Sequence, residues 1–317
     1  MTVGTALVLG ATGGAGGEIA QALLRRGWQV RALVRYPAKA TRLPSEFALV
    51  RGDAMQRADV VAAAEGVDVI VHAVNPPGYR NWGALVGPML ENTLAAAEHF
   101  GARIAFPGTV YNYGPDAGTE LAEDAPQNPK TKKGALRVGL EKRLSQAAAS
   151  GKARVLILRA GDYFGPRPGN NWFSQGLVKP GKPVTAISYP GPFEIGHAWA
   201  YLPDLGETFA RLLEREAELA PFERFHFGGH WLEPGVAMAH AIRKAIGREV
   251  PIRPMPWWLL KILSPTNETL RELMEVRYLW QGPLRLDNTK LAAFLGEEPR
   301  TPLDDAVRAT LKGLGCL

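Results

Sequence analysis

The feature that most constrains this chain is a glycine-rich loop close to its N-terminus. Residues 5–9 (TALVL) form a short apolar run typical of a buried strand, and the next residues read GATGGAGG. Apolar side chains then recur at helical spacing from Ile19 to Leu24, and Gly27 is placed to end that helix. A strand, a glycine turn and a helix in immediate succession indicate the first unit of a parallel α/β sheet.

The glycines of this loop, Gly10, Gly13 and Gly16, give the pattern G-x-x-G-x-x-G. The first permits a tight turn, the second lets the backbone approach a pyrophosphate, and the third lets the helix pack on the strand. The helix N-terminus offers free N–H groups and a partial positive charge to phosphates. The loop therefore predicts dinucleotide binding, with Thr12 and Gly14 as further contacts; the alternative is a turn with only a structural role.

Further strand-like runs follow at regular intervals along the chain. They read WQVRALVR, FALVRGD, VDVIVHAVN, ARIAFPG and ARVLILRAG, with helices expected between them at residues 84–100 and up to about Ser150. Such alternation implies right-handed crossovers and a doubly wound parallel sheet of the Rossmann type. After Gly165 proline and glycine become dense and the alternation stops, which indicates a smaller C-terminal substrate lobe.

The predicted domain organisation follows from this change. We expect residues 1–165 to form the dinucleotide-binding domain. Residues 201–229 should return to it as a helix (YLPDLGETFARLLE) and a strand (RFHFGG). Residues 166–200 and 230–317 are then the smaller lobe, lying over the C-terminal edge of the sheet.

The end of the second predicted strand bears on the choice of cofactor. An acidic residue there would bind a ribose 2′-hydroxyl, whereas an arginine favours a 2′-phosphate. The chain has Arg35 and Lys39 in this place, and no acid between Arg31 and Glu46. This favours NADP, with NAD as the second choice; the alternative is that both cations are merely solvated.

The ends of the next two strands supply further candidate contacts. Asp53 follows the third strand and is placed to meet the adenine. Ala73 and Asn75 follow the fourth strand and are expected beside the dinucleotide. His72 is interpreted as a satisfied strand-end histidine and not as a catalyst.

Charge, cysteine count and histidine spacing bear on the ligands, disulfides and metal sites that the protein could have. The net charge of +6 suits an anionic ligand, but the charges are spread along the chain as ordinary surface charge. The single cysteine, Cys316, excludes an internal disulfide, and the scattered histidines give no reason to expect a metal site. Without a signal peptide or an apolar run near the roughly 20 residues that span a bilayer, we expect a cytoplasmic protein with no membrane partner. The most apolar window, WWLLKIL at 257–263, is expected to be a buried or lid helix.

The motifs of this chain, and their order along the sequence, resemble those of the short-chain dehydrogenase/reductase superfamily, in its extended branch of NAD(P)-dependent epimerases and dehydratases. The resemblance covers nearly all 317 residues. It implies a homodimer as the default assembly. The motifs are GATGGAG (10–16), RGD (51–53), HAVNPP (72–77), GTVYNYGP (108–115), LILRAGDYFGP (156–166), YLPDL (201–205) and LGEEPRTPLDDAVRATL (295–311).

The resemblance also implies where catalysis would occur. The family uses a Ser or Thr after the fifth strand and a Tyr-x-x-x-Lys pair on the next helix, and Thr109 takes the first position. No Tyr-x-x-x-Lys occurs in this chain. Aligning Glu141 with the glutamate that commonly follows the pair puts Arg137 in the place of the lysine and Lys133 in the place of the tyrosine.

These substitutions lie in the basic stretch PKTKKGALRVGLEKR. Arg137 could bind a ribose hydroxyl or phosphate but could not shuttle a proton, because it is permanently charged. Lys133 is either a base with a lowered pKa or a solvated lysine of the first helical turn. Tyr111, Tyr113 and Tyr163 are candidates to replace the missing tyrosine, although strand-end aromatics are more often packing groups.

The sequence therefore predicts an NADP-dependent oxidoreductase or epimerase/dehydratase-like enzyme for a small carbonyl, alcohol or sugar nucleotide. The alternative is a non-catalytic NADP-binding sensor or regulator, supported by the missing Tyr-x-x-x-Lys. Nucleic acid is not an expected partner. The basic residues are not interleaved with aromatics, and a leucine stripe occupies half of the helix that they open.

Overall fold

The computed structural model describes residues 3–76, 81–167, 169, 171–266 and 268–317. Pro77 of the HAVNPP motif lies outside these residues. The main feature is a seven-stranded sheet in which every neighbouring pair of strands is parallel. This confirms the predicted doubly wound α/β fold. In spatial order the strands are β11 (Phe222–Phe227), β7 (Arg154–Ala160), β5 (Arg103–Thr109), β4 (Val69–His72), β1 (Thr5–Leu9), β2 (Gln29–Val34) and β3 (Ala48–Arg51).

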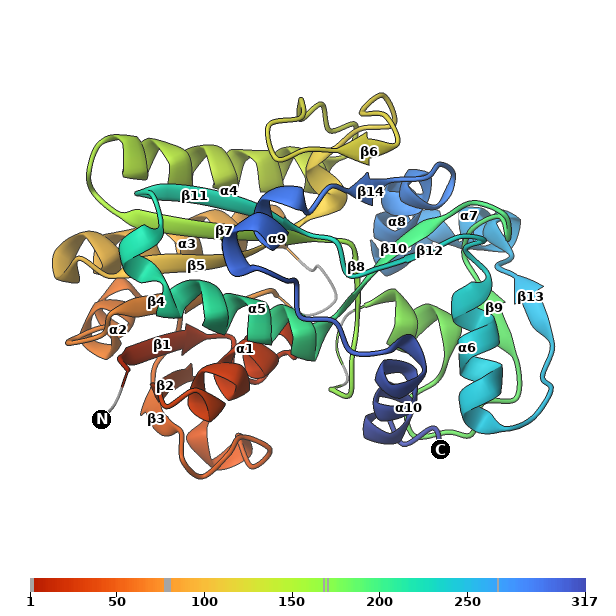
Figure 1. The fold of residues 1–317 in the computed structure, drawn as a ribbon, viewed down its shortest axis with the longest axis horizontal. Coiled ribbons are helices and arrows are strands. Elements are labelled where there is room, and N and C mark those ends of the chain that lie inside the picture. The colour runs from red at the N-terminus through yellow and green to blue at the C-terminus, as the bar shows by residue number, and fades with distance from the viewer. Residues whose placement is uncertain (1–2, 77–80, 168, 170, 267) are drawn as a thin grey trace.

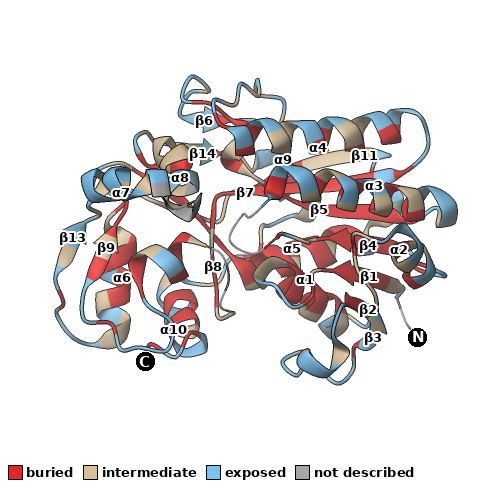
Figure 2. Ribbon diagram, turned by 180° about the vertical axis from the view of Figure 1, so that it is seen from behind, coloured by how far each residue is buried: buried red, intermediate tan, exposed pale blue. Residues whose placement is uncertain are grey.

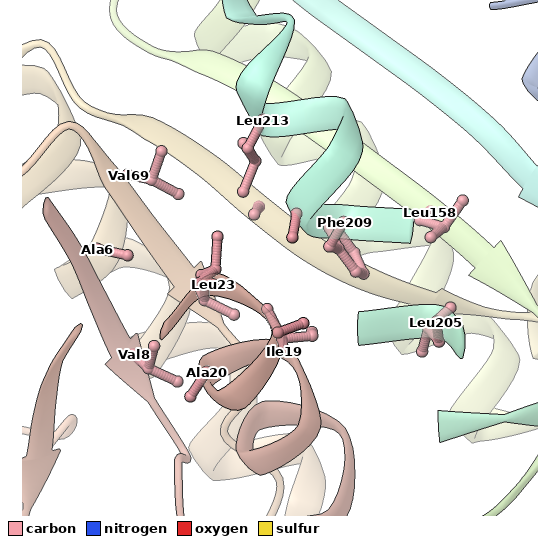
Figure 3. Packing of buried hydrophobic residues seen from close by; sticks show 14 of the residues in the cluster. Ala6, Val8, Ile19, Ala20, Leu23, Val69, Leu158, Leu205, Phe209 and Leu213 are labelled. Atoms are coloured by element: carbon pink, nitrogen blue, oxygen red, sulfur yellow. The ribbon is translucent and has the colours of Figure 1, made fainter. Parts of the chain in front are cut away.

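Helices cover both faces of this sheet (Figure 1). On one face α1 (Gly14–Arg25) and α5 (Leu202–Glu214) pack together, and their apolar residues meet Ala6, Val8 and Val69 of the strands (Figure 3). On the other face α2 (Arg57–Ala63), α3 (Trp82–Phe100) and α4 (Lys132–Ala149) pack against Leu7 and Ile70. The inner strands β1, β4, β5 and β7 are buried almost throughout (Figure 2), which explains their nearly continuous apolar runs. The edge strand β3 is largely exposed.

The remaining elements form a smaller lobe beside the sheet. Its core is rich in aromatic side chains such as Phe173, Trp199 and Trp280, all buried. Its strands are β8 (Asp162–Phe164), β10 (His197–Tyr201) and β12 (His230–Leu232) in one sheet, β9 (Ile187–Tyr189) with β13 (Ile252–Pro254), and β6 (Glu120–Leu121) with β14 (Arg285–Leu286). Its helices are α6 (Ala237–Ile246), α7 (Trp257–Leu263), α8 (Glu268–Glu275) and α10 (Leu303–Gly313), while α9 (Thr289–Leu295) contacts β11. Short helical turns lie at Pro37–Lys39, Val110–Asn112, Phe173–Leu177, Glu216–Glu218, Ser264–Thr266 and Val276–Trp280.

The chain passes between the two parts more than once. Residues Phe222–Phe227 return as β11 and pair in parallel with β7, at the edge of the main sheet. Val110, Leu121 and Phe164, by contrast, pack in the aromatic core of the smaller lobe. The smaller lobe therefore includes side chains that come directly after β5 and β7, within the range 1–165.

The most apolar window of the sequence, residues 257–263, forms the helix α7 (Trp257–Leu263). No residue of α7, all of them described, is buried, and Trp258 and Ile262 are 68% and 66% exposed. Of the two expectations for 257–263, a buried or a lid helix, the buried one is therefore wrong, because the helix lies on the surface of the smaller lobe. Within the described ranges, no helix is both long and apolar enough to cross a membrane.

Candidate functional site

A cavity of about 720 Å³ lies over the C-terminal ends of β1, β2, β4 and β5. This volume is in the range of small-molecule and cofactor sites. The structure brings ten of the eleven predicted cofactor residues to its wall: Gly10, Thr12, Gly13, Gly14, Arg35, Lys39, Asp53, Ala73, Asn75 and Arg137.

The glycine loop forms the wall of the cavity between β1 and α1. Gly10 has a φ of +95°, and its carbonyl accepts a hydrogen bond from the Gly13 N–H at 2.9 Å. A Cβ on Gly10 would lie 2.5 Å from the Ala73 carbonyl oxygen, so only glycine fits this turn. Gly16 lies behind the loop, where a Cβ would come 2.4 Å from the Gly10 oxygen. The α1 N-terminus thus stands close behind the turn, as a phosphate site requires.

One end of the cavity carries exposed cations. Arg35, Tyr36 and Lys39 follow β2, and the Lys39 ammonium lies over the Tyr36 ring, 5.2 Å from its centre. Asp53 follows β3 and accepts a hydrogen bond from the Met55 N–H at 3.0 Å. This end of the cavity therefore carries two exposed cations and one acid.

The opposite end is aromatic and contains Arg137. Its guanidinium lies over the rings of Trp82 and Phe106, 5.3 and 5.6 Å from their centres, and donates to the Pro107 carbonyl at 3.4 Å. Its Nε is buried and has no hydrogen-bond partner among the described residues. A buried N–H donor without a partner, in a residue that lines a cavity, is suited to an oxygen of a ligand. Arg137 therefore fits a ribose or phosphate oxygen of a dinucleotide.

His72 lies on the cavity floor as a neutral group. Its Nδ1 is 2.7 Å from Thr93 Oγ1, whose hydroxyl can donate to the Met89 carbonyl at 3.2 Å. Burial, and then the nearby Arg137 charge, lower the pKa of His72 to about 3. His72 is therefore a hydrogen-bonded strand-end histidine at neutral pH, as interpreted from the sequence.

The predicted catalytic residues separate in the structure. Thr109 ends β5, and its Oγ1 accepts from the Tyr111 N–H at 3.3 Å. Lys133 lies in the first turn of α4, which Thr131 caps. Both lie outside the described lining of the cavity, so of the three predicted catalytic residues the structure brings only Arg137 to it. Lys133 is 3% exposed, and its interpretation as a solvated lysine is wrong because the start of α4 packs inward.

The structure also shows a buried polar network that the sequence did not suggest. Arg159 of β7 forms an ion pair with Glu141 of α4, with Nη2 and Oε2 2.5 Å apart. Arg159 also donates to the Tyr113 hydroxyl, which lies 3.0 Å from Nε2 of His226. His226 Nδ1 is 2.9 Å from the Leu121 carbonyl, so Nδ1 carries the proton and Nε2 accepts from Tyr113. The available signal was Arg159, which directly follows the apolar run VLIL in ARVLILRAG.

This network removes Tyr113 from the candidate proton donors. Burial is the main reason that the pKa of Tyr113 rises to about 12, and the side chain is fully buried. Tyr111 lies outside the described cavity lining and packs against the aromatic core of the smaller lobe. Tyr163 does line the cavity.

His226 predicts a pH dependence of stability. Burial and the Arg159 charge lower its pKa to about 3 in the folded state, against about 6.5 in an unfolded chain. Below pH 6.5 the unfolded state binds a proton that the folded state does not. The free energy of unfolding should therefore fall by about 1.4 kcal/mol for each pH unit below 6.5 on account of this one group. Urea unfolding of His226→Gln should show a shallower pH dependence than the unmodified protein; parallel curves from pH 7 to 4.5 would contradict this.

Comparisons with known proteins agree with this site. Residues 10–114 match a family model described as NAD(P)H-binding. A 3-diazoavenalumate denitrifying reductase of a Streptomyces species is 30% identical over 177 residues, which cover 51% of this chain and 57% of the relative. The match thus spans little more than half of that relative.

Solved structures extend the likeness in fold to the whole chain. The UDP-glucose 4-epimerase of Thermus thermophilus, in complex with NAD, has a TM-score of 0.73 at 22% identity. The UDP-glucuronic acid 4-epimerase of Bacillus cereus, in complex with UDP-glucuronic acid and NAD, has a TM-score of 0.74 at 20% identity. Each comparison covers 98% of both chains. Residues 10–114 thus match an NAD(P)H-binding family, and the whole chain has the same fold as these NAD-binding epimerases.

Proposed function

We propose that this protein is an NADP(H)-dependent oxidoreductase that reduces a small carbonyl compound or oxidises the matching alcohol. The observation that carries the proposal is the cavity itself, with a glycine loop in its wall, cations at one end and Arg137 among aromatic rings at the other. The reductase among the relatives supports it. When bound, the nicotinamide supplies the hydride chemistry, and the protein supplies binding and orientation.

The residues of the chain would divide this work by position. The Gly10–Gly14 turn and the α1 N-terminus hold the pyrophosphate, and Asp53 lies at the adenosine end. Arg137 binds a ribose or phosphate oxygen through its buried, unpaired Nε. Because a guanidinium stays charged, Arg137 orients the ligand without exchanging protons with it.

The preference for NADP over NAD rests on Arg35 and Lys39. A charge-assisted hydrogen bond contributes about 1.5–3 kcal/mol, so replacing both with serine should weaken NADPH binding about 100-fold or more. NADH binding should change by about twofold at most, because NADH has no 2′-phosphate to lose contact with. Calorimetric titration with both cofactors measures the two affinities.

Arg51 provides the matched control for this double variant. It ends β3, is exposed, and lies outside the described cavity lining. Arg51→Ser should therefore leave NADPH affinity nearly unchanged. An unmodified protein that binds NADH as tightly as NADPH would contradict the preference.

The reaction is tested by following NADPH absorbance over a panel of aldehydes, ketones and sugar nucleotides, and NADP reduction over the matching alcohols. Turnover of at least one compound is expected. The absence of Tyr-x-x-x-Lys supports a second candidate, a non-catalytic NADP-binding sensor. Tight NADPH binding without turnover across the whole panel would favour the sensor and contradict the enzyme.

A further inference from the structure

The proposed reduction needs a proton as well as a hydride, and the usual tyrosine is missing from α4. We propose that the hydroxyl of Tyr163, on β8, donates the proton to the substrate oxygen. This inference rests on the proposed function, and it selects one of the three tyrosines that the sequence left open as replacements for the missing one.

The layout of the cavity places Tyr163 at the reacting end. The glycine loop marks the position of the phosphates, and Arg35 and Asp53 mark the adenosine beyond them. A nicotinamide bound in this orientation would extend the other way, toward Phe106 and Pro107 of β5. Tyr163 lines the cavity there, and its hydroxyl donates to the Gly108 carbonyl at 2.9 Å, one residue before the end of β5.

The other titratable side chains described at this end, Arg137 and His72, do not fit the role. Arg137 is permanently charged. His72 is neutral with a pKa of about 3, so it carries no readily released proton at neutral pH. A phenol is protonated at neutral pH and forms a phenolate when it gives up the proton, which a general acid for an alkoxide requires.

The surroundings of Tyr163 fix its position. Its ring packs against the apolar core formed by α1, α5 and the sheet. Its backbone pairs with Ala200 of β10. The preceding residue, Asp162, is buried and lies 2.8 Å from Nε2 of His197, also on β10, which ties the two strands together. A catalytic group on a strand anchored in this way keeps its geometry better than one on a loop.

The step balances with the reduced dihydronicotinamide as hydride donor. The substrate carbonyl carbon accepts the hydride with its electron pair, and the C=O π electrons move to the oxygen. That oxygen takes the proton as the O–H bond of Tyr163 breaks, so the carbonyl becomes an alcohol and the nicotinamide is oxidised. The resulting phenolate, with the Arg137 cation lining the same end, regains its proton from solvent.

The test is Tyr163→Phe, which removes the hydroxyl and keeps the packing. Carbonyl reduction should slow about 100-fold or more, because a positioned general acid contributes 10²–10⁴-fold. The Kd for NADPH, measured by fluorescence titration, should stay within about twofold, since the phenol is not assigned to cofactor binding. Tyr111→Phe removes a hydroxyl outside the described cavity lining and should keep nearly full activity.

The outcomes separate this inference from the proposed function. Turnover by the unmodified protein with little loss in Tyr163→Phe would overturn the inference alone. A parallel loss of NADPH binding would also overturn it, because Tyr163 would then act by positioning the cofactor. An unmodified protein that binds NADPH but turns nothing over would overturn the proposed function, and this inference with it. Loss of turnover with intact NADPH binding supports both.

Discussion

Replacing Glu141 with alanine should lower the free energy of unfolding by about 3–5 kcal/mol, the largest change in stability expected of the substitutions considered. The reason is that Arg159, fully buried, would keep its charge without its ion-pair partner. Asn112, which donates to Glu141 at 2.9 Å, would lose an acceptor as well. Urea unfolding followed by circular dichroism measures the change.

The matched control is an exposed ion pair between α4 and α3. Arg143 of α4 pairs with Glu91 of α3 at 2.7 Å, but the two side chains are 41% and 51% exposed. Water screens such a pair and both charges stay solvated, so Glu91→Ala should cost less than about 1 kcal/mol. Equal losses for Glu141→Ala and Glu91→Ala would show that Arg159 is not held as a buried charge.

Replacing Gly16 with alanine should strongly weaken the binding of both NADPH and NADH. The added Cβ would lie 2.4 Å from the Gly10 carbonyl oxygen and 3.1 Å from the Ala73 Cβ. Gly10 and Ala73 both line the cavity. To relieve the clash, one or both of them must move, which changes the shape of the cofactor site. Displacement of this kind should weaken binding roughly 100-fold or more and cost about 1–3 kcal/mol of stability.

Gly139 is the control for the same chemical change. It lies in α4 with no described atom within 4 Å of the position that a Cβ would take. Gly139→Ala should therefore keep cofactor affinity and stabilise the protein by up to about 1 kcal/mol, since alanine favours the helix. Calorimetric titration of both variants gives the comparison, and near-normal binding by Gly16→Ala would contradict the close packing of this loop.

The sequence was informative where the signal is local. The inner strands of the main sheet are buried on both faces, so each appeared as an apolar run. The cofactor residues follow consecutive strands, and parallel strands bring their C-terminal ends to one edge. For that reason residues as distant as Gly10, Asp53 and Asn75 could be assigned to one site.

Features that depend on distant partners could not be predicted in the same way. Glu141 and Lys133 occur in a strongly basic helix whose charges suggest a solvated face, yet both are buried. The partner of Glu141 is Arg159, on another element, and helical periodicity contains no information about that pairing. WWLLKIL has the composition of a core segment, so composition alone left open whether α7 is buried or lies on the surface.

The late position of β11 in the sequence leaves one edge of β7 unpaired during synthesis. β7 is complete at Ala160, but its outer edge is paired only by Phe222–Phe227, after the chain has built β8, β9 and β10. During synthesis the N-terminal half therefore emerges with an apolar strand edge uncovered, the kind of edge that joins other chains. In a fragment that ends before β11, this edge of β7 would stay unpaired. We therefore expect the main sheet and the smaller lobe to fold together as one unit.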